Sequence, residues 1–188
     1  MTAPAGRARP RRHDPERRER IIGAALDVIA EHGVAGTTHR KVAAAADVPL
    51  GSMTYHFAGI DEVVTAAFTL LADSTADGFE EALGAARDGA EAVDAVVGLI
   101  TGEPLGSRRN AMLSYELYAL AARNPDLRRV TDAWMARSRH ALERHFDSTT
   151  AALLDALIEG LSIHRTLSLN PLPEAEVRAA VLRMVTTR

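Results

Sequence analysis

The sequence of 188 residues has no cysteine. This absence excludes a disulfide framework, a thiolate metal site and a thiol nucleophile, and it predicts a protein of the reducing cytoplasm. Aromatic residues are also scarce, at 4% of the chain, whereas hydrophobic residues together reach 47%. Because alanine and leucine supply much of that fraction, the composition favours helices over strands. No alternating strand pattern is present either, so we expect an all-α fold.

Long hydrophobic runs are missing as well. No apolar segment approaches the ~20 residues that a membrane-spanning helix needs, and the basic N-terminus is not followed by a hydrophobic signal core. We therefore expect a soluble cytoplasmic protein without a membrane partner. The sequence also has no Gly-rich phosphate loop, nucleophile elbow or His-Glu-x-x-His motif. We accordingly expect no enzyme activity, no catalytic residues, no cofactor and no metal site.

Charge is distributed unevenly along the chain, although the formal net charge is only −3. Residues 1–60 contain nine Arg or Lys and six Asp or Glu, a charge of +3. Residues 61–188 contain thirteen and nineteen respectively, a charge of −6. A basic front and an acidic rear are typical of a protein that contacts phosphates with one end only.

The chain divides by composition into three predicted parts. Residues 1–13 are rich in Pro, Ala and Arg and are predicted to be a disordered basic arm. This arm either adds phosphate or minor-groove contacts or is a solvated leader without a role. Residues 14–60 are predicted to form a small unit of three helices, and residues 61–188 a larger helical domain.

Capping signals and apolar spacing place the three helices of the small unit. The first begins at Asp14 and ends at Gly33, because Asp is a favoured N-cap and Gly a frequent helix terminator. Thr38 caps the second helix, and Asp47 in the following turn is expected to take a positive φ. The third helix covers residues 49–57.

Breaks that contain Gly, Pro or Asn divide the larger domain into longer helices. These breaks and the apolar spacing between them predict helices near residues 60–86, 90–101, 107–123, 126–146, 149–168 and 174–186. Residues 149–168 are especially apolar, and Ala152 and Gly160 permit close packing. The apolar side chains of this segment either fill the intramolecular core or pair with a second copy of the chain.

Residues 37–57 are the most informative segment. They indicate two short helices joined by a tight turn, and the second helix closes on an apolar aromatic residue, Phe57. That helix presents small and hydrogen-bonding side chains in few positions: Gly51, Ser52, Thr54, Tyr55 and His56. A helix that lies against base edges needs small residues for close approach and polar residues for contact. The segment therefore indicates a helix-turn-helix.

This segment resembles the tetracycline-repressor (TetR) family of transcription regulators. The family pattern is matched at Thr38, Val42, Ala43, Ala46, Val48, Gly51, Ser52, Met53, Phe57 and Val63, and the match is dense over residues 17–68. The resemblance implies an N-terminal three-helix DNA-binding domain and a helical domain that binds an effector and dimerises. It also implies a transcriptional regulator, which we expect to be a repressor released from a two-fold operator by a small apolar ligand.

Three positions depart from the family pattern. Asp47 stands where the family usually has glycine, Thr54 where tyrosine is common, and Ile60 where lysine is frequent. The lysine would contact the DNA backbone, so its loss removes one phosphate contact and leaves more of the affinity to Arg40 and Lys41. We expect the DNA contacts of this protein to differ from the family norm at these positions.

The resemblance places the third helix in the major groove of DNA. The exposed candidates for base contact on this helix are Leu50, Gly51, Ser52, Thr54 and Tyr55. Arg40 is a candidate for a guanine or a phosphate, and further phosphate contacts are expected from Thr38, Lys41, Tyr55 and His56. Because helical spacing turns Met53 and Phe57 inward, Tyr55 is predicted to face outward. The alternative is that Tyr55 or His56 packs inward.

A two-fold operator requires a dimer, and the resemblance favours a homodimer formed by the helices near residues 126–146 and 149–168. It also implies a small-molecule effector, whose identity the sequence does not disclose. The candidate ligand-binding residues suit an apolar molecule but equally suit a plain core: Phe68, Phe79, Met112, Tyr115, Tyr118, Trp134 and His164.

A helical protein-interaction module without DNA binding is the alternative function. It leaves unexplained why the third helix is small and polar on its outward side and why positive charge gathers before residue 60. We therefore expect a double-stranded DNA operator as the main partner.

Overall fold

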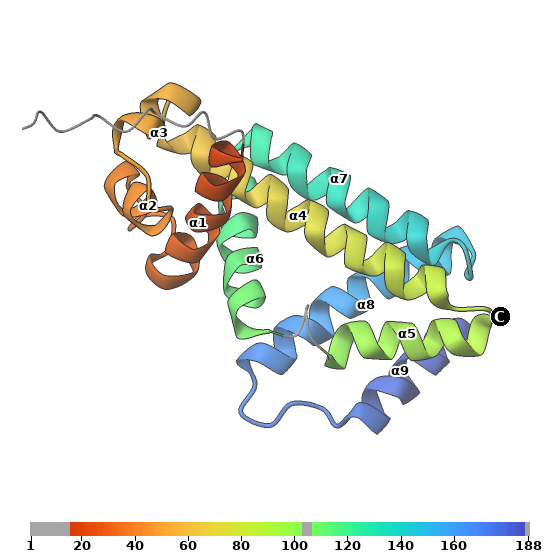
Figure 1. Cartoon of the computed structure of the whole chain (residues 1–188). Coiled ribbons are helices and arrows are strands. Elements are labelled where there is room, and N and C mark those ends of the chain that lie inside the picture. Colours follow the sequence, from red (N-terminus) through yellow and green to blue (C-terminus); the bar gives the residue numbers. More distant parts are fainter. Residues whose placement is uncertain (1–15, 103–106, 187–188) are drawn as a thin grey trace, which may run out of the picture.

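The computed structural model describes residues 16–102 and 107–186, and within these residues helices joined by turns and loops are present and strands are absent, which confirms the predicted all-α fold (Figure 1). None of the described helices is long and apolar enough to cross a membrane. The helices are α1 (Arg17–His32), α2 (His39–Ala45), α3 (Gly51–His56), α4 (Ile60–Ala85), α5 (Gly89–Thr101), α6 (Arg108–Ala121), α7 (Pro125–Leu142), α8 (Ser148–Leu167) and α9 (Glu174–Thr186).

Local signals fixed the ends of the first helices as predicted. Gly33 ends α1 with a φ of 66°, and the Thr38 hydroxyl caps α2 by accepting a hydrogen bond from the Lys41 backbone N–H at 3.3 Å. Asp47 takes a φ of 50°, a left-handed conformation that Asp tolerates better than most residues. The predicted cap at Asp14 lies outside the described residues, as does the predicted arm 1–13, and the described N-cap of α1 is Glu16.

One predicted boundary is wrong. The helix expected to reach residue 146 ends at Leu142, because the following amides bond three residues back, His145 N–H to the Leu142 carbonyl at 3.0 Å. This tighter turn brings the half-buried Phe146 against the core formed by α5, α8 and α9. It also places Asp147 as the N-cap of α8, where its side chain accepts from two backbone N–H groups.

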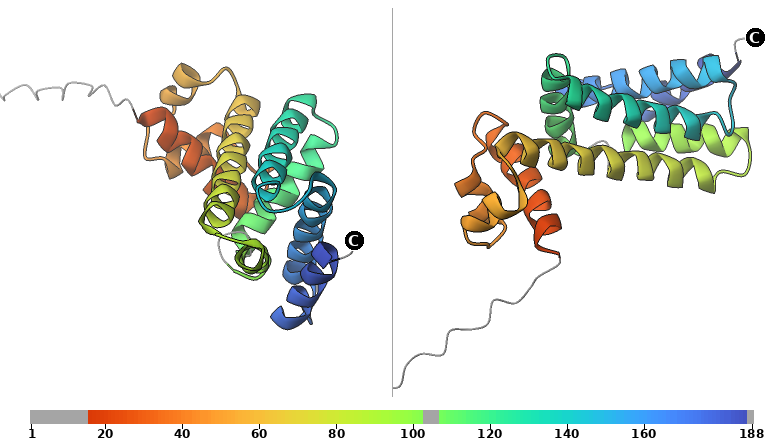
Figure 2. Two further views of the ribbon diagram at one scale, coloured as in Figure 1. Left: turned by 90° about the vertical axis from the view of Figure 1, so that its right-hand side faces the viewer. Right: turned by 90° about the horizontal axis from the view of Figure 1, so that it is seen from above.

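The small unit does not have a core of its own. α1, α2 and α3 gather at one end of α4, and their apolar side chains are continuous with those of the front half of α4 and of α6 and α7 (Figure 2). A second core joins the rear of α4 to α5, α8 and α9. Phe68 of α4 is fully buried in the first core and Leu83 in the second. The long helix α4 therefore connects the small unit of α1, α2 and α3 to the rest of the molecule.

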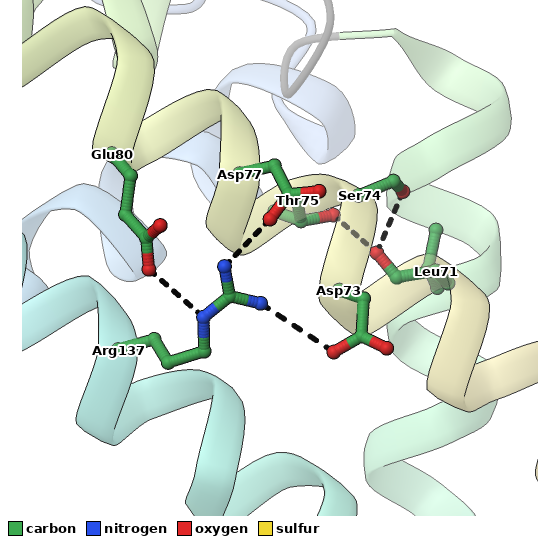
Figure 3. Close-up of polar contacts among 7 residues, drawn as sticks. All are labelled: Leu71, Asp73, Ser74, Thr75, Asp77, Glu80 and Arg137. Carbon is green, nitrogen blue, oxygen red and sulfur yellow. Dashed lines mark hydrogen bonds and ion pairs between the residues drawn. The ribbon is translucent and has the colours of Figure 1, made fainter.

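α4 and α7 run side by side and are joined by one arginine and three carboxylates (Figure 3). Arg137 of α7 contacts Glu80 at 2.9 Å, Asp77 at 2.6 Å and Asp73 at 3.5 Å. These acidic residues share one face of α4, because they are three and four residues apart. The hydrogen bond from Arg137 lowers the pKa of Glu80 below its ordinary value. We call this group the α4–α7 seam.

α6 is the second link between the two ends of the molecule. Its Glu116 accepts a hydrogen bond from the Val34 backbone N–H at 3.2 Å, immediately after the end of α1. Its Arg109 forms an ion pair of 2.6 Å with Asp27 on α1. Two separate polar contacts thus hold the small three-helix unit against α6.

Candidate functional site

The exposed surface of α3 carries most of the residues predicted to contact bases. Tyr55 is 83% exposed and Leu50 51%, and Gly51 and Thr54 are exposed beside them. Met53 and Phe57 are buried, and the Arg18 guanidinium of α1 lies 5.1 Å from the centre of the Phe57 ring. The predicted outward direction of Tyr55 is therefore confirmed.

The burial of Ser52 removes this residue from the predicted set of base contacts. Only 8% of its surface is exposed, so it faces inward together with Met53. α3 is only six residues long, and its inward side takes up two consecutive positions at the centre of the helix. His56 is half-buried and packs edge-on against Tyr55, with ring centres 4.9 Å apart.

The start of α2 lies next to α3 and adds positive charge to the same surface. Arg40 and Lys41 are exposed, and a shallow groove between the two helices is lined by Thr38, His39, Arg40, Leu50, Met53 and Thr54. The N-terminus of a helix attracts anions, because its first amide groups point outward without intrahelical partners. This surface thus combines cations, hydroxyl groups and an exposed aromatic ring, which is the chemistry of phosphate and base contact.

A cavity of about 370 Å³ lies between α6, α7 and α8, with Phe79 of α4 in its wall. It brings together four of the predicted ligand-binding residues: Phe79, Tyr115, Tyr118 and Trp134. The remaining lining residues are Ala111, Ser114, Met135, Ser138, Asp155, Ala156, Ile158, Glu159, Ser162 and Ile163. The volume is within the range of pockets that hold a drug-sized molecule.

Three predicted ligand-binding residues lie elsewhere. Phe68 is fully buried in the core beneath α1, because α4 is covered by other helices along this stretch. Met112 projects from the opposite side of α6 towards Asp27 and Glu31 of α1. His164 is exposed, because two residues of helix rotate it away from Ser162 and the cavity side of α8.

The cavity wall combines stacked aromatic rings with acidic groups. The rings of Tyr118 and Trp134 lie 5.9 Å apart at an angle of 19°, and the Tyr118 hydroxyl donates to Glu159 Oε2 at 2.9 Å. Burial raises the pKa of the Glu159 carboxyl, against the opposing effect of this hydrogen bond. Burial and the neighbouring Glu159 likewise raise the pKa of Tyr118, so the proton remains on the phenol.

Asp155 lies one turn before Glu159 on the same face of α8. Burial raises the pKa of Asp155 as well, and the opposing charge of Arg139 lies 3.8 Å away. Neither carboxylate was predicted from the sequence, because acidic residues on a helix most often form a solvated face. Their signal was the spacing of Asp155, Glu159 and Ser162, which line up on one side of an otherwise apolar helix.

Comparison with known proteins covers both ends of the chain. The model of the bacterial regulatory proteins of the tetR family matches residues 21–67, and that of the tetracyclin repressor-like C-terminal domain matches residues 87–187. A search of curated proteins gave no match.

Solved structures extend the likeness to the whole chain. A candidate transcriptional regulator from Streptomyces coelicolor A3(2) is 49% identical, with a TM-score of 0.83, over 92% of this chain and 100% of that one. A member of the TetR family from Streptomyces coelicolor A3 is 37% identical, with a TM-score of 0.76, over 92% and 100%. The multidrug binding protein EbrR complexed with ethidium is 36% identical, with a TM-score of 0.72, over 92% and 100%. Other structures of EbrR are complexes with proflavin and with malachite green.

These matches decide between the two functions that the sequence left open. Both family models describe regulators, and the relatives at 36–49% identity match this chain over nearly all of its length. They support a DNA-binding regulator and not an interaction module without DNA binding. The chain belongs to the TetR family and is a DNA-binding transcriptional regulator.

Proposed function

We propose that the protein is a repressor that binds a two-fold DNA operator as a homodimer and leaves it when an aromatic organic cation enters the cavity. The observation that carries this proposal is the position of Glu159 and Asp155 in one cavity with the stacked rings of Tyr118 and Trp134. Repression is proposed because a protein that occupies an operator blocks access of the polymerase.

The DNA-binding step is proposed for the exposed surface of α2 and α3. α3 would enter the major groove with Leu50, Thr54 and Tyr55 towards the base edges. Gly51 has no side chain and so permits close approach of DNA. The position is open, since a Cβ added there would meet no neighbouring atom of the protein within 4 Å. The phosphate contacts would come from Thr38, Arg40, Lys41 and His56, which position the helix without reading the sequence.

A homodimer is proposed because one six-residue helix contacts only a few base pairs. Two copies would place their α3 helices about 34–36 Å apart, one turn of the duplex, or a multiple of this distance. The proposed interface is formed by α8 together with α9, because exposed leucines gather on these helices and the segment between them: Leu153, Leu167, Leu169, Leu172 and Leu182. This proposal keeps the predicted segment 149–168 and replaces 126–146 with α9.

The proposed effector class follows from the charge and shape of the cavity. Two half-buried carboxylates share the cavity, and the ion pair of Arg139 involves Asp155 and not Glu159. A ligand cation would compensate this negative charge, and a flat ring system would stack on Tyr118 and Trp134. The dyes complexed with EbrR are aromatic organic cations, which supports the same ligand class here.

Release of DNA is proposed to pass through α6 and α4. α6 carries Tyr115 and Tyr118 in the cavity wall, and between them Glu116 bonds to the end of α1. α4 carries Phe79 in the cavity wall and continues into the DNA-binding unit. An effector that binds one setting of these helices better than another shifts the relative orientation of the two α3 helices in a dimer.

The proposal is tested by titrating the protein into labelled DNA taken from beside its own gene, with and without proflavin. We expect salt-sensitive, sequence-specific binding that proflavin releases. Absence of specific binding would refute the operator, and binding that proflavin does not release would refute the effector class.

A double variant, Asp155→Asn with Glu159→Gln, separates effector binding from direct effects of the dye on DNA. Proflavin intercalates into DNA by itself, so release that does not involve the cavity would be equal for the variant and the wild type. We expect the variant to bind DNA normally and to require at least about tenfold more proflavin for release, the equivalent of one charge-assisted contact.

A further inference from the structure

We infer that the hydroxyl groups of Tyr115, Ser138 and Ser162 form a hydrogen-bonding subsite in the cavity, which selects effectors that carry N–H or O–H groups. This inference rests on the proposed function and specifies the effector further. Within the class of aromatic cations, it predicts preference for amino-substituted rings over equally charged rings whose amino groups are fully alkylated.

The three hydroxyl groups belong to residues of three different helices that line the same cavity. Tyr115 lies on α6, Ser138 on α7 and Ser162 on α8, and all three residues line the cavity. Each oxygen is buried, and none has a hydrogen-bond partner among the residues that the structure describes. Ser138 as a whole is only 2% exposed. Unpaired buried hydroxyls are costly, so partners are expected from whatever fills the cavity.

Several other hydroxyl residues of this protein have a hydrogen-bond partner within their own helix. A serine or threonine inside a helix can donate to a carbonyl three or four residues earlier. Thr75 donates to the Leu71 carbonyl at 2.8 Å, Thr131 to that of Arg128 at 3.0 Å, and Thr166 to that of Ser162 at 3.1 Å. Ser138 and Ser162 have no such local bond, although both residues line the cavity.

On α8, the hydroxyl residue Ser162 follows the two cavity carboxylates, Asp155 and Glu159. Asp155, Glu159 and Ser162 are four and three residues apart, so they follow one face of the helix over roughly 10 Å. A carboxylate only accepts hydrogen bonds, whereas a hydroxyl both donates and accepts. A flat cation of two or three fused rings with amino groups at its edge would meet both kinds of partner in one orientation.

The test compares proflavin with acridine orange. Both dyes are acridine monocations at neutral pH, but in acridine orange four methyl groups replace the exocyclic N–H hydrogens. Trp134 reports binding directly, because it is the only tryptophan of the chain and lies in the cavity wall. Quenching of its emission gives both affinities without DNA. We expect proflavin to bind at least about tenfold more tightly, as for the loss of one or two hydrogen bonds.

Variants separate hydrogen bonding from the extra bulk of the methyl groups. Ser138→Ala with Ser162→Ala, and separately Tyr115→Phe, should reduce the preference for proflavin at least about threefold. Ser74→Ala is the matched control, because this hydroxyl donates to the Leu71 carbonyl at 3.0 Å and does not line the cavity. Thermal unfolding verifies the fold, and Tyr115→Phe keeps the test available if the double serine variant does not fold.

The outcomes distinguish this inference from the proposed function. If neither dye quenches Trp134, the proposed class of effector is wrong. If both dyes bind but the hydroxyl variants keep the wild-type preference, the preference comes from size alone and the subsite is refuted. A reduced preference in the hydroxyl variants, with the Ser74 variant unchanged, supports it.

Discussion

The two functional regions of the molecule differ in how they are built. The DNA-binding surface comes from about 20 consecutive residues, and its side chains project from α2 and α3 into solvent. The cavity is assembled from α4, α6, α7 and α8, between Phe79 and Ile163 in the sequence, and most of its wall is buried or half-buried. Substitutions in the first region should therefore change stability little, whereas substitutions in the second should change it in either direction.

The largest effect is expected where the two regions share a core. Phe68→Ala should lower the free energy of unfolding by about 3–5 kcal/mol, because the ring is fully buried between α4 and the DNA-binding unit. Urea denaturation measures this loss. Leu70→Ala, at an exposed position of the same helix, is the control and should change stability little. A loss below about 1 kcal/mol for Phe68→Ala would mean that the two regions do not depend on a shared core.

The DNA-binding surface should be separable from stability. Tyr55→Ala and Arg40→Ala should each weaken specific DNA binding by about 10- to 100-fold and leave the melting temperature unchanged, because both side chains are exposed. Fluorescence anisotropy at two salt concentrations separates their roles. Loss of a phosphate contact at Arg40 should reduce the salt dependence, whereas loss of Tyr55 should not. Unchanged affinity would remove these residues from the interface.

In the cavity, by contrast, a substitution should change both effector binding and stability. The pKa of Glu159 is raised in the folded protein, so folding favours its protonated form. Its contribution to stability is therefore complete below the ordinary carboxyl pKa and is lost as pH rises through the higher pKa of the folded state. Glu159→Gln should consequently gain melting temperature relative to the wild type between pH 5 and pH 8. Parallel curves of melting temperature against pH for the two proteins would contradict a half-buried carboxylate whose charged form is disfavoured by folding.

The smallest effect concerns the turn of the DNA-binding unit. Asp47→Gly should stabilise the protein by about 0.5 kcal/mol, because glycine takes a φ of 50° without the steric cost that a Cβ imposes. Ala45→Gly is the control, since this exposed position of α2 has helical geometry and should lose stability instead. Equal changes of the same sign at both positions would show that the left-handed turn is not strained.

The sequence predicted the parts of the fold that depend on local chemistry. Gly33, Thr38 and Asp47 each act through their own backbone or the next few residues, so their roles follow from residue type and spacing. The direction of Tyr55 followed in the same way from the positions of Met53 and Phe57. For Ser52 the same reasoning was wrong, because the inward side of this six-residue helix includes two consecutive residues, Ser52 and Met53.

The cavity could be predicted only in part. Four of the aromatic residues predicted to bind a ligand line the cavity, because large side chains in amphipathic helices face the interior. Whether such a side chain meets another side chain or an open space depends on helices that lie far away in the sequence. Phe68 meets α1, and Phe79, eleven residues later on the same helix, meets the cavity. Asp155 and Glu159 were missed for the same reason.

The α4–α7 seam has a mechanical consequence. Its three carboxylates follow one another along α4 at intervals of about one helical turn, and a single guanidinium contacts all of them. A displacement of α7 by one turn along α4 would carry Arg137 to the next carboxylate and preserve most of the attraction. Separation of the two helices would break every ion pair at once. The ion pairs of the seam therefore resist separation of the two helices more than they resist sliding of one helix along the other.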